Sequence, residues 1–205
     1  MLEHLPASLG HVLRAVRPGL GKIVLHDADV AAGVRPLGVY SPAFGDGEPL
    51  PASYTGDGGR LSPPIEWRGV PAAARSVVVV IEDADSTTPR PLVHAILWNL
   101  PGEDGGLGEG VLNALETTDA TDLGRNSLLR HGYFPPDPPP GHGPHRYAIQ
   151  VFALDCIPDF EDAPGRGKLL GLLRRHAIAG GLLLATCERR GTVRALRRAP
   201  HRGIL

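Results

Sequence analysis

The chain has 205 residues, 42% of them hydrophobic and 21% charged, with a formal net charge of −1. This length suffices for one domain with a substantial core. No apolar run approaches the roughly 20 residues of a membrane-spanning helix. Two cysteines, Cys156 and Cys187, exclude a disulfide framework and lack metal-ligand spacing, so we expect reduced, buried thiols. The N-terminus shows no basic region followed by an apolar one, so we expect a cytoplasmic protein.

The 27 glycines and 21 prolines favour turns and short strands over long helices. Apolar residues at helical spacing predict a first helix over residues 7–17, which Pro18 and Gly19 end. We treat residues 1–36 as an N-terminal helical arm and residues 37–205 as one domain that includes a basic C-terminal tail. An arm of this kind either packs on the body or reaches a partner, and we expect it to help form a homodimer.

The clearest strand covers residues 76–82, a continuous β-branched run that predicts burial on both faces. A helix is expected over residues 168–176, closed by Gly180 and Gly181. Residues 102–125 read as a loop. Other strands are expected at 37–44, 62–67 (an edge strand, because two prolines cannot donate to a ladder), 92–99, 147–154 and 182–188. Strands separated by turns, with few short helices, predict a mainly β fold, an antiparallel β-sandwich with peripheral helices.

Basic residues gather at the C-terminal end. Residues 166–205 hold ten lysines and arginines against one acidic residue, Glu188. Such a segment can bind nucleic acid or an acidic partner, or it can lie on the acidic body of its own chain. No aromatic residues alternate with these arginines as a nucleic-acid platform requires, so we consider nucleic acid the less favoured partner.

Polar residues at strand ends are the candidates for chemistry. Asp83 and Asp85 follow the buried strand at alternate positions, so both carboxylates would face one cavity if the chain stays extended. His94 interrupts an apolar strand, and His145 and Tyr147 share one face of another. If these strands are neighbours, the five side chains converge on an anion site where imidazole and hydroxyl groups donate to phosphoryl oxygens. The alternatives are a solvated Asp-Ala-Asp turn and a core histidine.

A proline-rich loop, residues 135–144, precedes the strand that carries His145 and Tyr147. Proline fixes φ and removes a backbone donor, so the loop belongs to neither a helix nor a central strand. Its preset shape lowers the ordering cost of binding, and His142 adds a polar tip. The loop is either one wall of a small-molecule pocket or a connector with exposed histidines.

Several motifs occur together and in order: Ser62-Pro-Pro-Ile-Glu-Trp67, Asp83-Ala-Asp-Ser86, His94 four residues before Trp98, and Pro138-Pro-Pro-Gly-His-Gly-Pro-His-Arg-Tyr147. In these motifs the chain resembles the phosphatidylethanolamine-binding protein (PEBP) family, in its bacterial Raf-kinase-inhibitor-like branch. The resemblance implies a Greek-key β-sandwich with a small anion pocket. Matched by motif, its ligand-binding residues would be Asp83, Asp85, His94, Pro138, Pro139, His145 and Tyr147.

Two departures from the family pattern affect this expectation. Ala84 replaces the proline of the Asp-Pro-Asp turn, which loosens the turn. Asp137 stands before the three prolines, where a carboxylate at the rim would disfavour anions and favour a zwitterionic ligand. The resemblance implies a binding protein for a phosphoryl or zwitterionic head group that regulates or inhibits a kinase or protease, without a cofactor, a metal or enzymatic activity. The alternative is a hydrolase-like enzyme that uses the Asp/His pocket, although Ser86 does not fit a nucleophile-elbow sequence.

Overall fold

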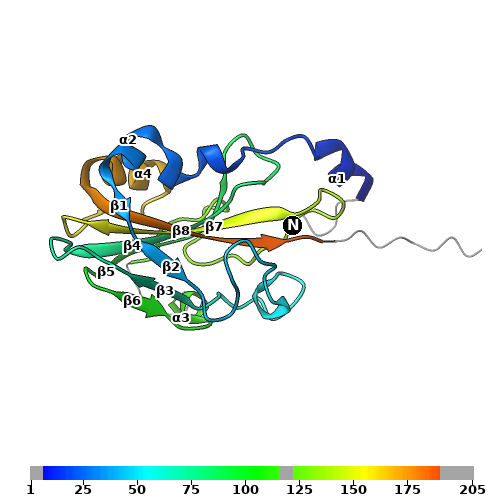
Figure 1. Ribbon diagram of the computed structural model, residues 1–205. Coiled ribbons are helices and arrows are strands. Elements are labelled where there is room, and N and C mark those ends of the chain that lie inside the picture. Colours follow the sequence, from blue (N-terminus) through cyan, green and yellow to red (C-terminus); the bar gives the residue numbers. More distant parts are fainter. Residues whose placement is uncertain (1–6, 116–121, 190–205) are drawn as a thin grey trace, which may run out of the picture.

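The computed structural model describes residues 7–115 and 122–189 and shows two stacked sheets (Figure 1). The large sheet has the order β1-β8-β7-β4-β5, and the small sheet has the order β2-β3-β6. Pairing is antiparallel except between β1 and β8. The expected mainly β, two-sheet architecture is therefore confirmed. The strands are β1 (Arg35–Pro36), β2 (Gly38–Tyr40), β3 (Ile65–Arg68), β4 (Ser76–Asp83), β5 (Leu92–Pro101), β6 (Gly105–Leu107), β7 (His145–Leu154) and β8 (Ala177–Cys187).

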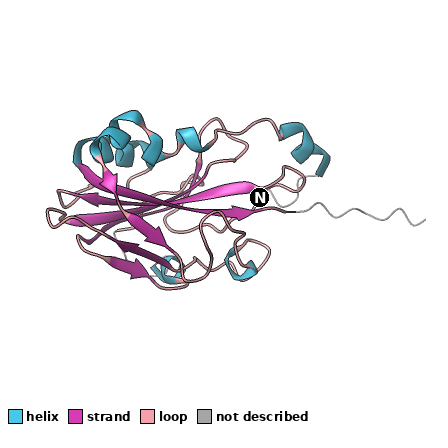
Figure 2. Cartoon of the chain, viewed as in Figure 1, coloured by secondary structure: helices cyan, strands magenta, loops and turns pink. Residues whose placement is uncertain are grey.

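Short helices lie at the periphery (Figure 2). They are α1 (Ala7–Leu13), α2 (Ala28–Gly33), α3 (Val111–Leu115) and α4 (Arg166–His176), with single 3₁₀ turns at Leu20–Lys22, Val24–His26 and Ala52–Tyr54. In Figure 1, α2 and α4 cover the outer face of the large sheet, and α1 lies at its other end. No described helix is long and apolar enough to cross a membrane.

Strand β4 is buried along its whole length, as predicted, because both of its faces are covered. Val77, Val79 and Ile81 face the small sheet and form the inter-sheet core with residues such as Ile65. Val78 and Val80 face the opposite way and pack beneath α2 and α4. The two-residue alternation of a strand thus builds two cores from one continuous apolar run.

The N-terminal arm packs on the body of its own chain. Glu82 is fully buried, and its carboxylate accepts hydrogen bonds from Val24 N (2.8 Å), Gln150 Nε2 (2.8 Å) and Arg166 Nε (2.7 Å). Gln150 in turn accepts from Leu25 N at 2.8 Å. The side chains of Glu82 and Gln150 thus accept the backbone N–H groups of a segment that has no partner strand. They thereby fix residues 20–26 on the large sheet. The homodimer stays a prediction.

Strand β3 is the middle strand of the small sheet, so the prediction of an edge strand is wrong. The first residue of the β3 ladder is Ile65, which pairs with Leu107. Pro63 and Pro64 both precede it, and their missing N–H groups therefore cost no ladder hydrogen bonds. The partner strand β6 lies within the segment that was expected to be a loop. It was not predicted because its glycines show no hydrophobic alternation.

Gly180 and Gly181 lie inside β8 and do not cap the preceding helix, which corrects a second prediction. Helix α4 ends at His176 and runs directly into the strand. A Cβ atom at Gly181 would lie 2.1 Å from the carbonyl oxygen of Leu37. The glycine is therefore explained by the close approach of the neighbouring chain. Helix α1 ends at Leu13, earlier than expected, and the basic tail beyond Arg189 lies outside the described residues.

Candidate functional site

The register of the large sheet gathers polar residues at one end. Asp83, the last residue of β4, is paired with Tyr147 on β7 and with Leu92 on β5. His145 lies two residues before Tyr147, and His94 lies two residues after Leu92. Because β7, β4 and β5 are adjacent, one row of the sheet carries side chains from three segments that are distant in sequence.

These side chains line a small buried cavity of about 20 Å³. A water molecule needs roughly 10–15 Å³ of such space, so the cavity has room for about one water and a larger ligand requires its wall to move. Six of the seven sequence-predicted residues contribute to the lining, and Asp85 does not. The full lining is Asp83, Ser86, Thr87, Leu92, His94, Phe134, Asp137, Pro138, Pro139, His145 and Tyr147.

Asp83 and His145 form a buried pair at the centre of the cavity wall. Oδ2 of Asp83 lies 2.7 Å from Nδ1 of His145. The other oxygen of Asp83 accepts the backbone N–H of Asp85 at 2.8 Å. The second ring nitrogen of His145, Nε2, lies 2.7 Å from Nδ1 of His142. Both nitrogens of His145 are thus bonded to protein, so this ring offers a ligand no free donor.

His94 is a neutral acceptor. Its Nδ1 lies 2.6 Å from the carbonyl oxygen of Phe134, which can only accept, so Nδ1 carries the proton. Complete burial lowers the pKa of His94 to about 4, against the opposing charge of Asp83. The ring stacks on Phe134 at 4.0 Å and meets the edge of Tyr147 at 5.1 Å between centroids. Its Nε2 is therefore an unprotonated acceptor at physiological pH.

Tyr147 is the neutral donor of the cavity. Burial, followed by the charge of Asp83, raises the pKa of Tyr147 well above its usual value, so its hydroxyl keeps its proton. Within residues 7–115 and 122–189, neither this hydroxyl nor Nε2 of His94 takes part in a hydrogen bond. The cavity thus presents one unused donor and one unused acceptor beside the Asp83–His145 pair.

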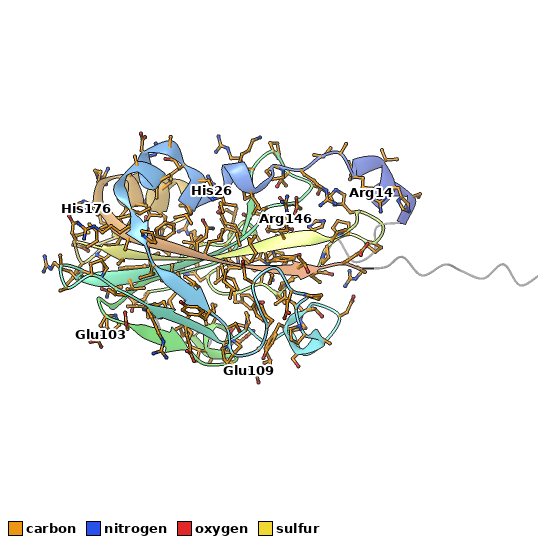
Figure 3. All side chains as sticks on the ribbon, in the orientation of Figure 1. Arg14, His26, Glu103, Glu109, Arg146 and His176 are labelled. Carbon is orange, nitrogen blue, oxygen red and sulfur yellow. The ribbon has the colours of Figure 1, made fainter. Side chains whose placement is uncertain are left out.

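Asp85 does not line the cavity and instead binds Arg146 of β7. Its carboxylate accepts from Nε and Nη2 of Arg146, each at 2.7 Å, and from the backbone N–H of the same residue at 2.9 Å. Burial opposes ionisation, but the bonds to Arg146 outweigh it and the pKa of Asp85 is lowered. The expected alternation fails because β4 ends at Asp83, so the chain turns before Asp85. Figure 3 shows Arg146 on the side of the large sheet that faces the N-terminal segment.

A larger groove of about 400 Å³ adjoins the cavity, and Pro138 lines both. At the rim, Arg189 bridges the carboxylates of Asp57 and Asp137. The Asp137 charge that sequence reasoning expected at the rim is therefore countered by a guanidinium. Arg189 and Asp57 are 132 residues apart, and no sequence motif links them. Half-buried Cys187 also lines the groove, and burial raises the pKa of its thiol to about 11.

A group of side chains that could hold a metal ion lies away from the cavity, although the sequence spacing of the cysteines did not indicate it. Among the described residues, Asp155, Cys156 and His176 place one ligand atom each within 4.8 Å of one another. This group follows the C-terminal end of β7, whereas the cavity lies at the N-terminal end of that strand. The described side chains of the cavity do not form such a group.

Comparisons with known proteins identify the family of this chain. The family model described as phosphatidylethanolamine-binding protein matches residues 40–188. A UPF0098 protein of Methanothermobacter thermautotrophicus is 33% identical over 153 residues, which are 75% of this chain and 99% of the relative. Two solved structures align with a TM-score of 0.67: a PEBP homologue from Chlamydia trachomatis (31% identity, 75% of this chain, 98% of that one) and YbcL of E. coli (29% identity, 76% and 100%). The chain therefore belongs to the PEBP family, in the bacterial and archaeal branch that includes YbcL and the UPF0098 proteins.

Proposed function

We propose that the protein binds a small ligand with a phosphoryl or zwitterionic head group in the cavity between β5, β4 and β7. The single observation that carries this proposal is the unused Tyr147 hydroxyl beside a buried, charge-balanced Asp83–His145 pair. The hydroxyl keeps some accessible surface in the cavity, so it can donate to a ligand that enters. The family name, phosphatidylethanolamine-binding protein, supports a head group that carries both a phosphoryl and an ammonium group.

The arrangement of charge favours a ligand of this class. The Tyr147 hydroxyl can donate to a phosphoryl oxygen. The negative charge of Asp83 is balanced by its partner His145, so we expect the pair to add no net negative charge to the cavity. Asp137 at the rim could accept from the ammonium group of the same ligand, in competition with Arg189. Because the free volume is only about 20 Å³, binding requires the loop around Pro138 to move toward the adjoining groove.

We propose a binding role and not catalysis. Ser86 lines the cavity, but its hydroxyl lies 2.8 Å from Thr88 Oγ1 and 3.3 Å from the carbonyl oxygen of Arg90. A nucleophilic serine would instead be bonded to a base such as a histidine. Cytoplasmic location, a homodimer and a kinase or protease partner stay predictions.

Tyr147→Phe is expected to weaken phosphate binding by at least about tenfold, because a hydrogen bond to a charged group contributes roughly 1.5–3 kcal/mol. Calorimetric titration with phosphate, O-phosphorylethanolamine and phosphorylcholine measures this. The matched control is Tyr40→Phe, which removes a hydroxyl from an exposed residue of β2. Equal affinities in the wild type and Tyr147→Phe would remove the main support for the site.

Arg189→Ala is expected to separate phosphate from O-phosphorylethanolamine. Without the guanidinium, the charge of Asp137 acts on the cavity, so phosphate affinity should fall about fivefold. O-Phosphorylethanolamine should lose less, since its ammonium group can replace the missing cation. Parallel titrations of both ligands give the ratio, with Arg35→Ala on exposed β1 as the control. An identical loss of affinity for the two ligands would show that Asp137 does not bind the ammonium group.

A further inference from the structure

His142 extends the Asp83–His145 pair into a chain of three hydrogen bonds. Oδ2 of Asp83 lies 2.7 Å from Nδ1 of His145, Nε2 of His145 lies 2.7 Å from Nδ1 of His142, and Nε2 of His142 lies 2.8 Å from the carbonyl oxygen of Leu13. Both imidazole rings are fully buried, and Asp83 is 5% exposed. Solvent therefore cannot substitute freely for a missing partner in this chain.

This chain of hydrogen bonds determines how many protons Asp83, His145 and His142 share. The carbonyl of Leu13 can only accept, so Nε2 of His142 carries a proton. One proton lies between the two rings, and a third lies between His145 and Asp83. Two neutral imidazoles supply only two protons, so the unit holds one more than an ionised aspartate with two neutral histidines. With three protons, Asp83, His145 and His142 together carry no net charge, whether the third proton is on His145 or on Asp83.

The third proton is best placed on His145. Burial lowers the pKa of His142, and the charges of His145 and Arg17 act in the same direction against the Leu13 carbonyl. An Nη2 atom of Arg17 lies 3.4 Å from Nδ1 of His142, which disfavours a positive charge there. His145 instead faces the carboxylate of Asp83. Among the described residues, the other titratable or charged groups near the two rings include Arg14, Asp85, His94, Asp137, Arg146, Tyr147, Cys187 and Arg189.

The N-terminal segment holds the outer end of this chain in place. Arg17 donates to the carbonyl oxygens of His142 and Pro144, each at 2.6 Å, and its Nη1 lies 3.5 Å from Asp85. Helix α1 packs so closely on the proline-rich loop that a Cβ atom at Gly10 would lie 2.1 Å from the carbonyl oxygen of Pro140. Leu13 and Arg17 both precede residue 40, where the family match begins. The residues that hold His142 thus come from outside the part of the chain that matches the family.

We propose that His142 is a positioning residue of the ligand site: held by Leu13 and Arg17, its Nδ1 accepts a hydrogen bond from Nε2–H of His145 and so keeps His145 cationic beside the cavity. This inference rests on the proposed function only where it concerns a ligand. A cationic His145 attracts a phosphoryl group, and a bound phosphoryl group in turn stabilises the proton. Phosphate affinity therefore falls as the pH rises through the loss of this proton.

The first test uses the ligand-free protein. Imidazole ¹⁵N chemical shifts report whether both nitrogens of His145 carry protons. In the wild type we expect both to be protonated at neutral pH. In His142→Ala the second proton should be lost about one pH unit lower, because the ring has lost its acceptor. His142→Asn, whose side-chain oxygen can accept near the position of Nδ1, should restore most of the shift. His131→Ala, at an exposed residue, is the control.

Phosphate titrations across pH complete the test. At a pH where His145 is protonated in the wild type but largely deprotonated in His142→Ala, the variant should bind phosphate more weakly, by at most about tenfold, and this difference should disappear at lower pH, where His145 is protonated in both proteins. An unchanged His145 titration in folded His142→Ala and His142→Asn would overturn the inference. If the ¹⁵N shifts change as expected while no variant and no wild type binds phosphate, the proton chain is upheld and the proposed function is refuted.

Discussion

Replacing Glu82 by alanine is expected to lower the free energy of unfolding by about 3 kcal/mol, near the lower end of the range for breaking a buried ion pair by removing one partner. Glu82 is fully buried and accepts from Val24 N, Gln150 and Arg166. Its loss strands two buried donors, while the guanidinium of Arg166, which is 21% exposed, regains partial contact with water. Urea unfolding measures the difference.

The control for this variant is Glu103→Ala, at an exposed residue near β6 that Figure 3 labels. Its expected effect is within about 0.5 kcal/mol. Limited proteolysis of the Glu82 variant should also cleave first within residues 20–26, since Glu82 and Gln150 hold this segment. A loss of stability equal to that of the Glu103 control would mean that the arm is held by its apolar contacts alone.

His145→Ala is expected to reduce phosphate affinity by at least about 30-fold, which corresponds to roughly 2 kcal/mol. The reason is the charge that remains: without the imidazole, the carboxylate of Asp83 faces the cavity uncompensated and repels the phosphoryl group. Calorimetry at constant pH measures the loss, and thermal unfolding monitored by circular dichroism shows whether the variant is folded.

A second variant separates charge repulsion from loss of shape. The double variant Asp83→Asn/His145→Ala removes the uncompensated carboxylate and should recover part of the affinity lost in His145→Ala. If the double variant binds as weakly as the single one, the contribution of His145 is packing of the cavity wall and not balance of charge. Full binding by His145→Ala would refute the assignment of the pocket.

Much of the fold was predictable because its signals are local. The β-branched run before Asp83 indicated a strand buried on both faces, and β4 is such a strand. Strands β7 and β5 were also expected, but only the structure shows them on either side of β4, in the register that pairs Asp83 with Tyr147. Strand β6 and the glycines of β8 were not predictable, because their reason is the close approach of chains that are distant in sequence.

The site was predictable to the extent that motif residues share a sheet row. Six of the seven expected residues line the cavity, and the seventh, Asp85, was misplaced because alternation was extended past the end of β4. Arg17 was missed altogether. It reaches His142 across 125 residues of sequence from a segment outside the family motifs, so no pattern near either residue indicates the contact.

The most direct test of the central claim is a crystal structure of the protein with O-phosphorylethanolamine. The proposed function predicts a phosphoryl group in the cavity, with one oxygen within hydrogen-bond distance of the Tyr147 hydroxyl and the loop around Pro138 displaced toward the groove. A ligand bound only in the groove near Asp57, with the cavity still closed, would contradict the claim and would place the binding site outside the Asp83–His145–Tyr147 cluster.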